Sequence, residues 1–272
     1  MNTWTHELMD PRVILITGAS SGLGAAMLAR LARNGNVVIG TSRNGSEDGT
    51  DALLRMDLRD EASVNKAVSS ILAIHGRIDV VVNNAGVGVQ GAVEDVDPAI
   101  AQQAFDINVL GALRVCRAVL PHMRGRKQGL IIQISSIAAN FGLPYRGFYS
   151  ASKAALDRMT ESLRIEVEPF GVQVVTVQPG EIKTPIAASR LRPAAIGEAY
   201  RRRYERAMQV LDGGLGYSRD PDELAEVVER IIEHSSRRTV YRVAQGRQLL
   251  SVLMKKILPG RWFERMVRKH YE

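Results

Sequence analysis

Cysteine is nearly absent from this sequence. Cys116 is the single one among 272 residues, so no disulfide can form within the chain. A protein without disulfides is typical of a reducing compartment, and we expect a cytoplasmic location. Long apolar runs are lacking too, since none reaches the roughly 18 to 20 residues that a membrane-spanning helix needs. Residues 1–10 contain acids and no apolar core, so we expect a flexible N-terminus and not a secretory signal.

Acidic residues are outnumbered by basic ones. The formal net charge is +7 and the pI is near 9.7. Such a balance suits nucleic acid, an anionic membrane or an anionic ligand. No zinc-finger, RNA-binding or basic-region motif accompanies the basic residues, so we expect no nucleic-acid partner. We assign no metal site.

The order of apolar and amphipathic segments is that of an α/β protein. Continuous apolar runs, which read as buried strands, alternate with helical segments. This alternation predicts a doubly wound parallel sheet of the Rossmann type, because buried parallel strands need helices on both faces. We expect a single domain at 11–245, followed by an amphipathic helical extension at 246–272. The main expected strands are 12–17, 37–41, 78–82, 129–134, 172–177 and 239–243, and the main expected helices are 25–32, 62–74, 98–121, 148–168 and 221–234.

A glycine-rich turn follows the first expected strand and opens the first helix. Glycines allow a tight turn and let a pyrophosphate approach the backbone, while the helix N-terminus offers free N–H groups and a positive dipole. In this strand–turn–helix context the segment predicts dinucleotide binding. The predicted contacts are Gly18, Ser20, Ser21, Gly22, Leu23 and Gly24.

The end of the second strand bears on the choice between NAD and NADP. Ser42 occupies the position where an acid would bind the adenosine ribose hydroxyls, and Arg43 follows it. The arginine fork suits a 2′-phosphate, so we predict NADP(H) in preference to NAD(H). Asp57 and Leu58 follow the third strand, where a carboxylate can accept a hydrogen bond from the adenine amino group.

A tyrosine and a lysine four residues apart are the most informative pair. Tyr149 and Lys153 share one helical face, and Ser136 lies thirteen residues before the tyrosine. A nearby cation favours the phenolate form of a tyrosine, which suits proton transfer near neutral pH. An isolated motif of this kind also fits an ordinary amphipathic helix. The surrounding motifs therefore decide between a catalytic pair and an ordinary helix.

Together these motifs resemble those of the short-chain dehydrogenase/reductase family. The match covers roughly residues 10 to 245 in the family's order and spacing. It consists of Thr17-Gly18-x-x-x-Gly22-x-Gly24, Asn83-Asn84-Ala85-Gly86, Asn108, Ser136, Tyr149-x-x-x-Lys153 and Pro179-Gly180.

The resemblance implies a role for each matching residue. Tyr149 would be the general acid/base, Ser136 would orient the substrate oxygen, and Lys153 would bind the nicotinamide ribose. Asn108 would hold a water in a proton relay. Cofactor contacts are implied for Asn84, Ala85 and Gly86, and for the nicotinamide loop with Pro179, Gly180, Ile182 and Thr184.

The implied activity is the NADP(H)-dependent interconversion of a ketone or aldehyde and an alcohol by hydride transfer. Substrate identity would depend on residues 181–217, together with Leu143 and Phe148 beside Ser136 and Tyr149. These segments are mixed apolar and aromatic, which favours a lipophilic steroid, retinoid or acyl substrate. The chain also resembles the 17β-hydroxysteroid and retinol dehydrogenase-like branch of the family.

Two other functions stay open on the same scaffold. One is a non-catalytic NADP-binding sensor or regulator, and the other is an epimerase or dehydratase. The family resemblance also implies a homodimer or homotetramer through helices near 99–123 and 148–169.

The C-terminal extension combines an apolar and a basic face. Leu249, Leu250, Leu253 and Ile257 share one face, and lysines and arginines lie between the apolar positions. Peripheral membrane contact is one interpretation. We favour the other, a helix that packs on its own domain or on a partner subunit.

Replacing Arg43 by alanine should raise the KM for NADPH far more than the KM for NADH, because only NADPH offers a 2′-phosphate to the guanidinium. Steady-state kinetics with both cofactors measure this. An unchanged ratio of the two KM values would contradict the predicted NADP preference.

Overall fold

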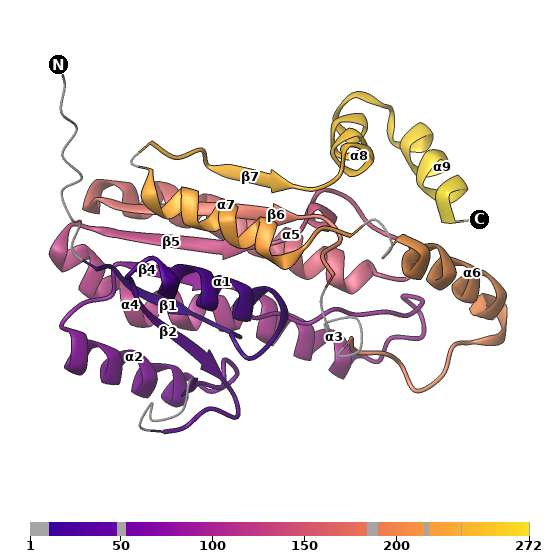
Figure 1. Cartoon of the computed structure of the whole chain (residues 1–272). Helices are drawn as coiled ribbons and strands as arrows, with labels where there is room; N and C mark the ends of the chain where they lie inside the picture. Colours follow the sequence, from indigo (N-terminus) through magenta and orange to yellow (C-terminus); the bar gives the residue numbers. More distant parts are fainter. Residues whose placement is uncertain (1–10, 48–52, 184–189, 215–217, 235, 272) are drawn as a thin grey trace, which may run out of the picture.

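A seven-stranded, wholly parallel sheet forms the centre of the protein (Figure 1). The computed structural model describes residues 11–47, 53–183, 190–214, 218–234 and 236–271. The expected flexible N-terminus, 1–10, lies outside this range. The strand order is β3-β2-β1-β4-β5-β6-β7. The strands are β1 Val13–Ile16, β2 Val37–Ser42, β3 Leu54–Arg55, β4 Val80–Asn83, β5 Gly129–Ile134, β6 Val172–Pro179 and β7 Val240–Val243.

Helices cover both faces of the sheet, which confirms the predicted doubly wound arrangement. Alternate residues along each strand contribute to different cores. Leu15, Val81 and Ile131 pack with α2, α4 and α5 on one face. Ile14, Val82 and Ile132 pack with α1 and α7 on the other. These helices are α1 Gly22–Arg33, α2 Glu61–His75, α4 Ala112–Arg126, α5 Gly147–Val167 and α7 Pro221–Glu233.

The long helix expected to end near Pro121 is divided differently. It consists of α3, Pro98–Phe105, then a π-helical turn, Asp106–Gly111, and α4, which continues through Pro121 to Arg126. The predicted end is therefore wrong. Pro121 deprives the Arg117 carbonyl of its N–H partner, and because both residues are exposed, water can bond that carbonyl and the helix continues. The π-helical turn, which carries Asn108, left no signal in the sequence that we recognised.

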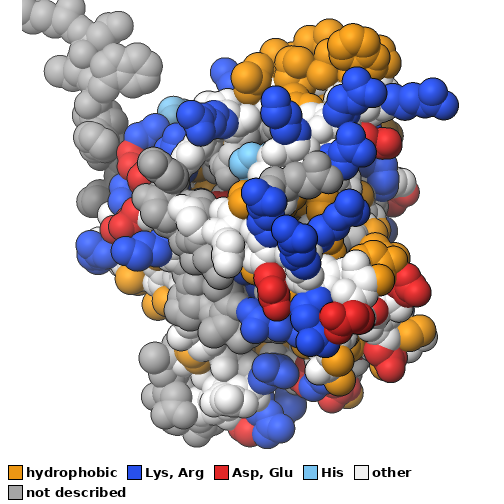
Figure 2. All heavy atoms as spheres, turned by 90° about the vertical axis from the view of Figure 1, so that its right-hand side faces the viewer, with side chains coloured by type: hydrophobic (Ala, Val, Ile, Leu, Met, Phe, Trp, Pro, Cys, Tyr) orange, Lys and Arg blue, Asp and Glu red, His pale blue; other side chains and the backbone are white. Residues whose placement is uncertain are grey.

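Three further helices gather where the strands end. They are α6 Glu198–Gly214, α8 Gly246–Ile257 and α9 Gly260–Tyr271. Figure 1 shows them beyond the arrowheads of β5 and β7, and Figure 2 looks directly onto this side of the molecule. In an open parallel sheet the ligand site lies outside the carboxyl ends of the strands. The three helices therefore stand beside the expected site.

No helix in the described ranges is both long enough and apolar enough to cross a membrane.

Ile131→Ala should lower the free energy of unfolding by about 2–5 kcal/mol, because it leaves a cavity in the middle of the sheet. Ile131 is 0% exposed. Ile74 on α2 is 71% exposed, so Ile74→Ala is the matched control and should change stability by less than about 0.5 kcal/mol. Urea denaturation followed by circular dichroism measures both, and equal losses would contradict the packing described for β5.

Candidate active site

A cavity of about 930 Å³ opens at the carboxyl ends of the strands. It brings together nearly all of the predicted site residues, from segments far apart in the sequence. Those that line it are Gly18, Ser20, Ser21, Gly22, Leu23, Gly24, Ser42, Arg43, Asp57, Leu58, Asn84, Ala85, Gly86, Ser136, Leu143, Tyr149, Lys153, Pro179, Gly180 and Ile182. Thr184 lies outside the described residues.

The turn between β1 and α1 is fixed by an amide side chain. Nδ2 of Asn84 donates to the carbonyl oxygens of Thr17 at 2.9 Å and Gly18 at 3.1 Å. Gly18 has φ of +66°, and a Cβ there would lie 2.9 Å from Cα of Ala85, so both backbone conformation and space require glycine. Ser21, the N-cap of α1, makes no side-chain capping bond. The first N–H groups of α1 are therefore left for an anionic ligand, which fits the pyrophosphate of a dinucleotide.

Two arginines line the cavity beside the end of β2. Arg43 is exposed and lines the cavity, and its predicted contact with a 2′-phosphate stays a prediction. Arg59 was not predicted, and its Nη2 lies 2.9 Å from Oδ2 of Asp57. The Arg59 hydrogen bond lowers the pKa of Asp57 below its usual value. Both carboxylate oxygens of Asp57 accept hydrogen bonds from Arg59, but Oδ2 accepts only one and keeps an acceptor position for an adenine amino group.

The predicted reaction centre lies at the other end of the cavity. Ser136 follows β5, while Tyr149 and Lys153 stand on the first turns of α5. Oγ of Ser136 accepts a hydrogen bond from the backbone N–H of Ala138 at 3.1 Å. Its own hydroxyl hydrogen is consequently available to a ligand oxygen. Tyr149 is half-buried at the cavity wall.

Lys153 is a buried cation. Its Nζ donates to the carbonyl oxygen of Ile134 at 2.9 Å, which ties α5 to the end of β5. Burial lowers the pKa of Lys153 to about 8, and the negative charge of Asp157 opposes that shift. Because Asp157 lies one helical turn further along α5, its carboxylate favours the charged form of the lysine.

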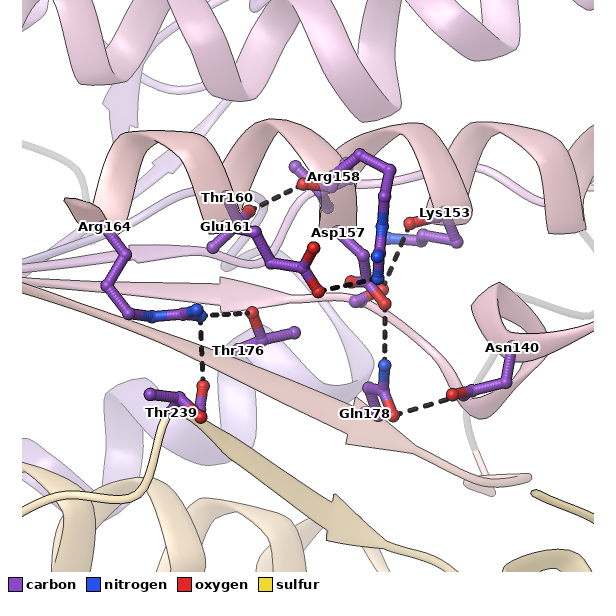
Figure 3. Close-up of polar contacts among 12 residues, drawn as sticks. Asn140, Lys153, Asp157, Arg158, Thr160, Glu161, Arg164, Thr176, Gln178 and Thr239 are labelled. Carbon is purple, nitrogen blue, oxygen red and sulfur yellow. Dashed lines mark hydrogen bonds and ion pairs between the residues drawn. The ribbon is translucent and has the colours of Figure 1, made fainter. Parts of the chain in front are cut away.

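Asp157 belongs to a buried polar network behind the cavity (Figure 3). Nε2 of Gln178, on β6, donates to Oδ2 of Asp157 at 2.6 Å. Oε1 of Gln178 accepts from Nδ2 of Asn140 at 3.2 Å and from Nε of Arg242 at 2.9 Å. Burial nevertheless raises the pKa of Asp157. The network fixes α5, β6 and β7 against each other directly behind Lys153.

Asn108 does not reach the cavity. Its Oδ1 accepts from the N–H of Val87 at 2.8 Å, and its Nδ2 donates to the Val87 carbonyl at 2.9 Å and to Oγ of Ser152 at 3.0 Å. These bonds hold the loop after β4, which carries Gly86, against α5. The water relay implied for Asn108 stays a prediction.

Phe148 is also placed differently from our expectation. It packs against a small core formed by Val89, Val96, Ala101 and Ala104, and it is not among the residues that line the cavity. Neighbouring positions of a helix point about 100° apart, so with Tyr149 facing the cavity Phe148 faces α3. Its predicted contact with substrate is therefore not seen.

A buried ion pair beside Tyr149 was missed from the sequence. Nη1 of Arg146 lies 2.7 Å from Oε1 of Glu181, and the guanidinium carbon lies 5.0 Å from the centre of the Tyr149 ring. The Glu181 charge helps to hold the pKa of Arg146 above its usual value despite its burial. Tyr271, near the C-terminal end of α9, also lines this part of the cavity. The only feature of the sequence that could have indicated a role for Arg146 is its position three residues before Tyr149.

The comparisons with known proteins agree with this geometry. The sequence profile of the short chain dehydrogenase family matches residues 12–194. The chain belongs to this family. It is 36% identical to the 3-ketodihydrosphingosine reductase of Bacteroides thetaiotaomicron over 97% of this chain and 99% of that protein. It is 32% identical to bovine retinol dehydrogenase 8 over 82% of this chain and 78% of that protein, in line with the predicted resemblance to retinol dehydrogenases.

A solved relative connects the cavity to a nicotinamide cofactor. The 3-ketoacyl-(acyl-carrier-protein) reductase from Brucella melitensis, complexed with NADH, matches with a TM-score of 0.72 and 28% identity. The match covers 87% of this chain and 98% of that chain. The uncapped start of α1 and the glycine cradle fit such a cofactor. The oxidoreductase class and a nicotinamide cofactor are thus established at the level of the family.

Asp157→Asn should lower the pKa of Lys153 further below about 8, because the charge that stabilises the ammonium is removed. The alkaline fall of kcat/KM should then begin at a lower pH than in the wild-type enzyme. A pH–rate profile measures this shift. Asp222→Asn, on the exposed first turn of α7, is the control and should leave the profile unchanged. Superimposable profiles for Asp157→Asn and wild type would show that Asp157 does not act on Lys153.

Proposed function

We propose that this protein is an NADP(H)-dependent oxidoreductase that interconverts a lipophilic ketone or aldehyde and the corresponding alcohol. The observation that carries the proposal is one cavity holding Ser136, Tyr149 and Lys153 at one end and an uncapped helix N-terminus beside a glycine cradle at the other. A dinucleotide spanning the cavity would present its nicotinamide near Tyr149.

Each polar side chain has a distinct task in this proposal. The bound NADPH supplies the hydride for reduction. The Tyr149 hydroxyl gives its proton to the carbonyl oxygen of the substrate, and in the reverse direction its phenolate takes that proton back. Ser136 donates a second hydrogen bond to the same oxygen and fixes its direction. The Lys153 ammonium stabilises negative charge on Tyr149 and offers its N–H groups to the cofactor ribose.

The preference for NADP(H) rests on the adenosine end of the cavity. Arg43 and Arg59 both line it, and Ser42 stands where an acid would favour NAD. Two guanidinium groups favour a 2′-phosphate, and a missing acid removes the competing contact with the ribose hydroxyls. We therefore retain NADP(H) as the proposed cofactor.

A lipophilic substrate is supported by the wall of the cavity around Tyr149. Apolar side chains come from the loop before α5, from the segment before α6, from α6 itself and from α9. They are Phe141, Leu143, Leu191, Val210, Leu211, Met266 and Val267. Because the 3-ketodihydrosphingosine reductase matches along the whole of both chains, a single-chain amino ketone is the lipophilic substrate to test first. Steroid, retinoid and acyl ketones are the compounds to test next.

Oligomerisation through α4 and α5 is part of the same proposal. Leu110, Leu113, Ile165 and Phe170 are exposed on or beside these helices. Apolar side chains left in water on this surface suit contact with a second copy.

Tyr149→Phe should abolish turnover while leaving NADPH binding nearly unchanged, because only the transferable proton is removed. NADPH consumption is measured with the amino ketone and with the other ketones, each with wild type and variant. Tyr145→Phe is the matched control and should keep activity, since the Tyr145 ring meets the Tyr204 ring edge to face and Tyr145 is not among the residues that line the cavity.

Substantial turnover by Tyr149→Phe would contradict the proposed proton transfer. Tight NADPH binding without turnover of any ketone would favour a sensor or regulator. Conversion of a substrate without net NADPH consumption would favour an epimerase or dehydratase.

A further inference from the structure

Helices α8 and α9 expose apolar side chains that the rest of the protein leaves uncovered. Ile257 on α8 is 65% exposed, and Trp262 on α9 is 67% exposed. Leu249, Leu250, Leu253 and Ile257 recur at the spacing of a single helical face, and all four are exposed. Figure 2 shows hydrophobic side chains gathered at the top of this side of the molecule, in the region of α8.

The inner side of the same helix pair is already packed. Val252, Phe263 and Tyr271 are buried, and the Phe263 ring meets Phe141 edge-on at 5.0 Å. The exposed side chains are therefore not needed to hold α8 and α9 on the domain. This packing agrees only in part with our expectation that the amphipathic extension packs on its own domain, because the leucine face of α8 points away from it.

Positive charge is concentrated on these helices. Residues 246–272 contain seven Lys or Arg and two Glu, so this short segment carries five of the seven net positive charges of the chain. On α8 the basic residues are Arg247, Lys255 and Lys256. On α9, Arg261 and Arg265 are exposed on the same side as Trp262. Basic residues thus stand next to the exposed apolar residues in both helices.

The same helices form one wall of the cavity. Gln248 and Ser251 of α8 and Met266, Val267 and His270 of α9 line it. Any partner that bound the outer side of α8 and α9 would therefore lie next to one wall of the cavity. The same cavity contains Tyr149.

We propose that α8 and α9 dock the protein onto an anionic lipid bilayer. The positive charge of the two helices favours an anionic lipid surface over a second copy of this chain. A helix that exposes leucine and tryptophan among lysines and arginines lies at a membrane interface with its apolar face in the acyl region and its cations at anionic headgroups. A second copy docked through the same face would bring two positively charged helix pairs together, and like charges oppose that contact.

Docking in this orientation would bring α9, and with it the cavity wall formed by Met266 and Val267, close to the lipid. A lipophilic compound dissolved in the bilayer would then enter the cavity without crossing water. This consequence goes beyond the proposed chemistry, and the docking itself does not depend on which substrate the protein turns over.

The test compares the binding of the full-length protein to two kinds of vesicle, phosphatidylcholine alone and phosphatidylcholine mixed with phosphatidylglycerol. Co-sedimentation should show binding to the mixed vesicles that weakens as salt is raised. Ile257→Asp should reduce that binding on the order of tenfold or more, because it places a carboxylate in the apolar face. Leu253→Asp should act in the same way.

Ile74→Asp is the matched control. Ile74 lies on α2 and is 71% exposed, so the same substitution adds the same charge at a similarly exposed site away from α8 and α9. It should bind the mixed vesicles like the wild-type protein. Circular dichroism verifies that all variants are folded, and light scattering records their mass in solution.

Three results would overturn the proposal. The first is a wild-type protein that binds neither vesicle, and the second is equal binding by Ile257→Asp and Ile74→Asp. The third is a smaller mass in solution for Ile257→Asp without any vesicle binding by the wild type, which would assign the face to a second copy. None of these measurements uses turnover, so failure of docking and failure of the proposed reaction are distinguishable.

Discussion

The buried ammonium of Lys153 is the interaction on which the rest of the site depends. A cation with 4% exposure is costly to hold away from water, and here it is held by one carbonyl oxygen and one nearby carboxylate. The carbonyl belongs to Ile134 at the end of β5, and the carboxylate of Asp157 is fixed by Gln178 on β6. These contacts tie helix α5 to β5 and β6. Tyr149 stands one turn before Lys153 on the same helix, so the same contacts also fix the position of Tyr149 at the cavity wall.

Charge is distributed unevenly along the cavity, and the two ends differ accordingly. Arg43 and Arg59 stand at the end that fits the adenosine part of a dinucleotide. Near Tyr149, the Arg146 guanidinium is compensated by Glu181. A neutralised pair combined with apolar walls suits an uncharged, lipophilic reacting group better than a polyanion. The basic excess of the chain is instead carried largely by α8 and α9, where only Arg247 of the lysines and arginines lines the cavity.

The sheet could be predicted from the sequence because buried parallel strands are continuous apolar runs and the turns between them contain glycine and proline. The phosphate cradle could be predicted because its glycines and the start of α1 are neighbours in the chain. The predictions were wrong where packing against the rest of the chain decides the outcome. Pro121 does not end α4, because it faces water. Phe148 packs against residues of α3 and does not line the cavity, although it is the neighbour of Tyr149 in the chain.

The sequence by itself determined the fold, the family, and the identity and spacing of Ser136, Tyr149 and Lys153, because these depend on local periodicity and on motifs read along the chain. Only the tertiary structure decided what surrounds them. Glu181 reaches the reaction centre from the loop after β6 and Tyr271 reaches it from α9, and no local pattern brings such residues together. The exposure of the leucine face of α8 was likewise decided only by the tertiary structure. Whether an amphipathic helix is buried or exposed is set by what the remaining chain leaves beside it.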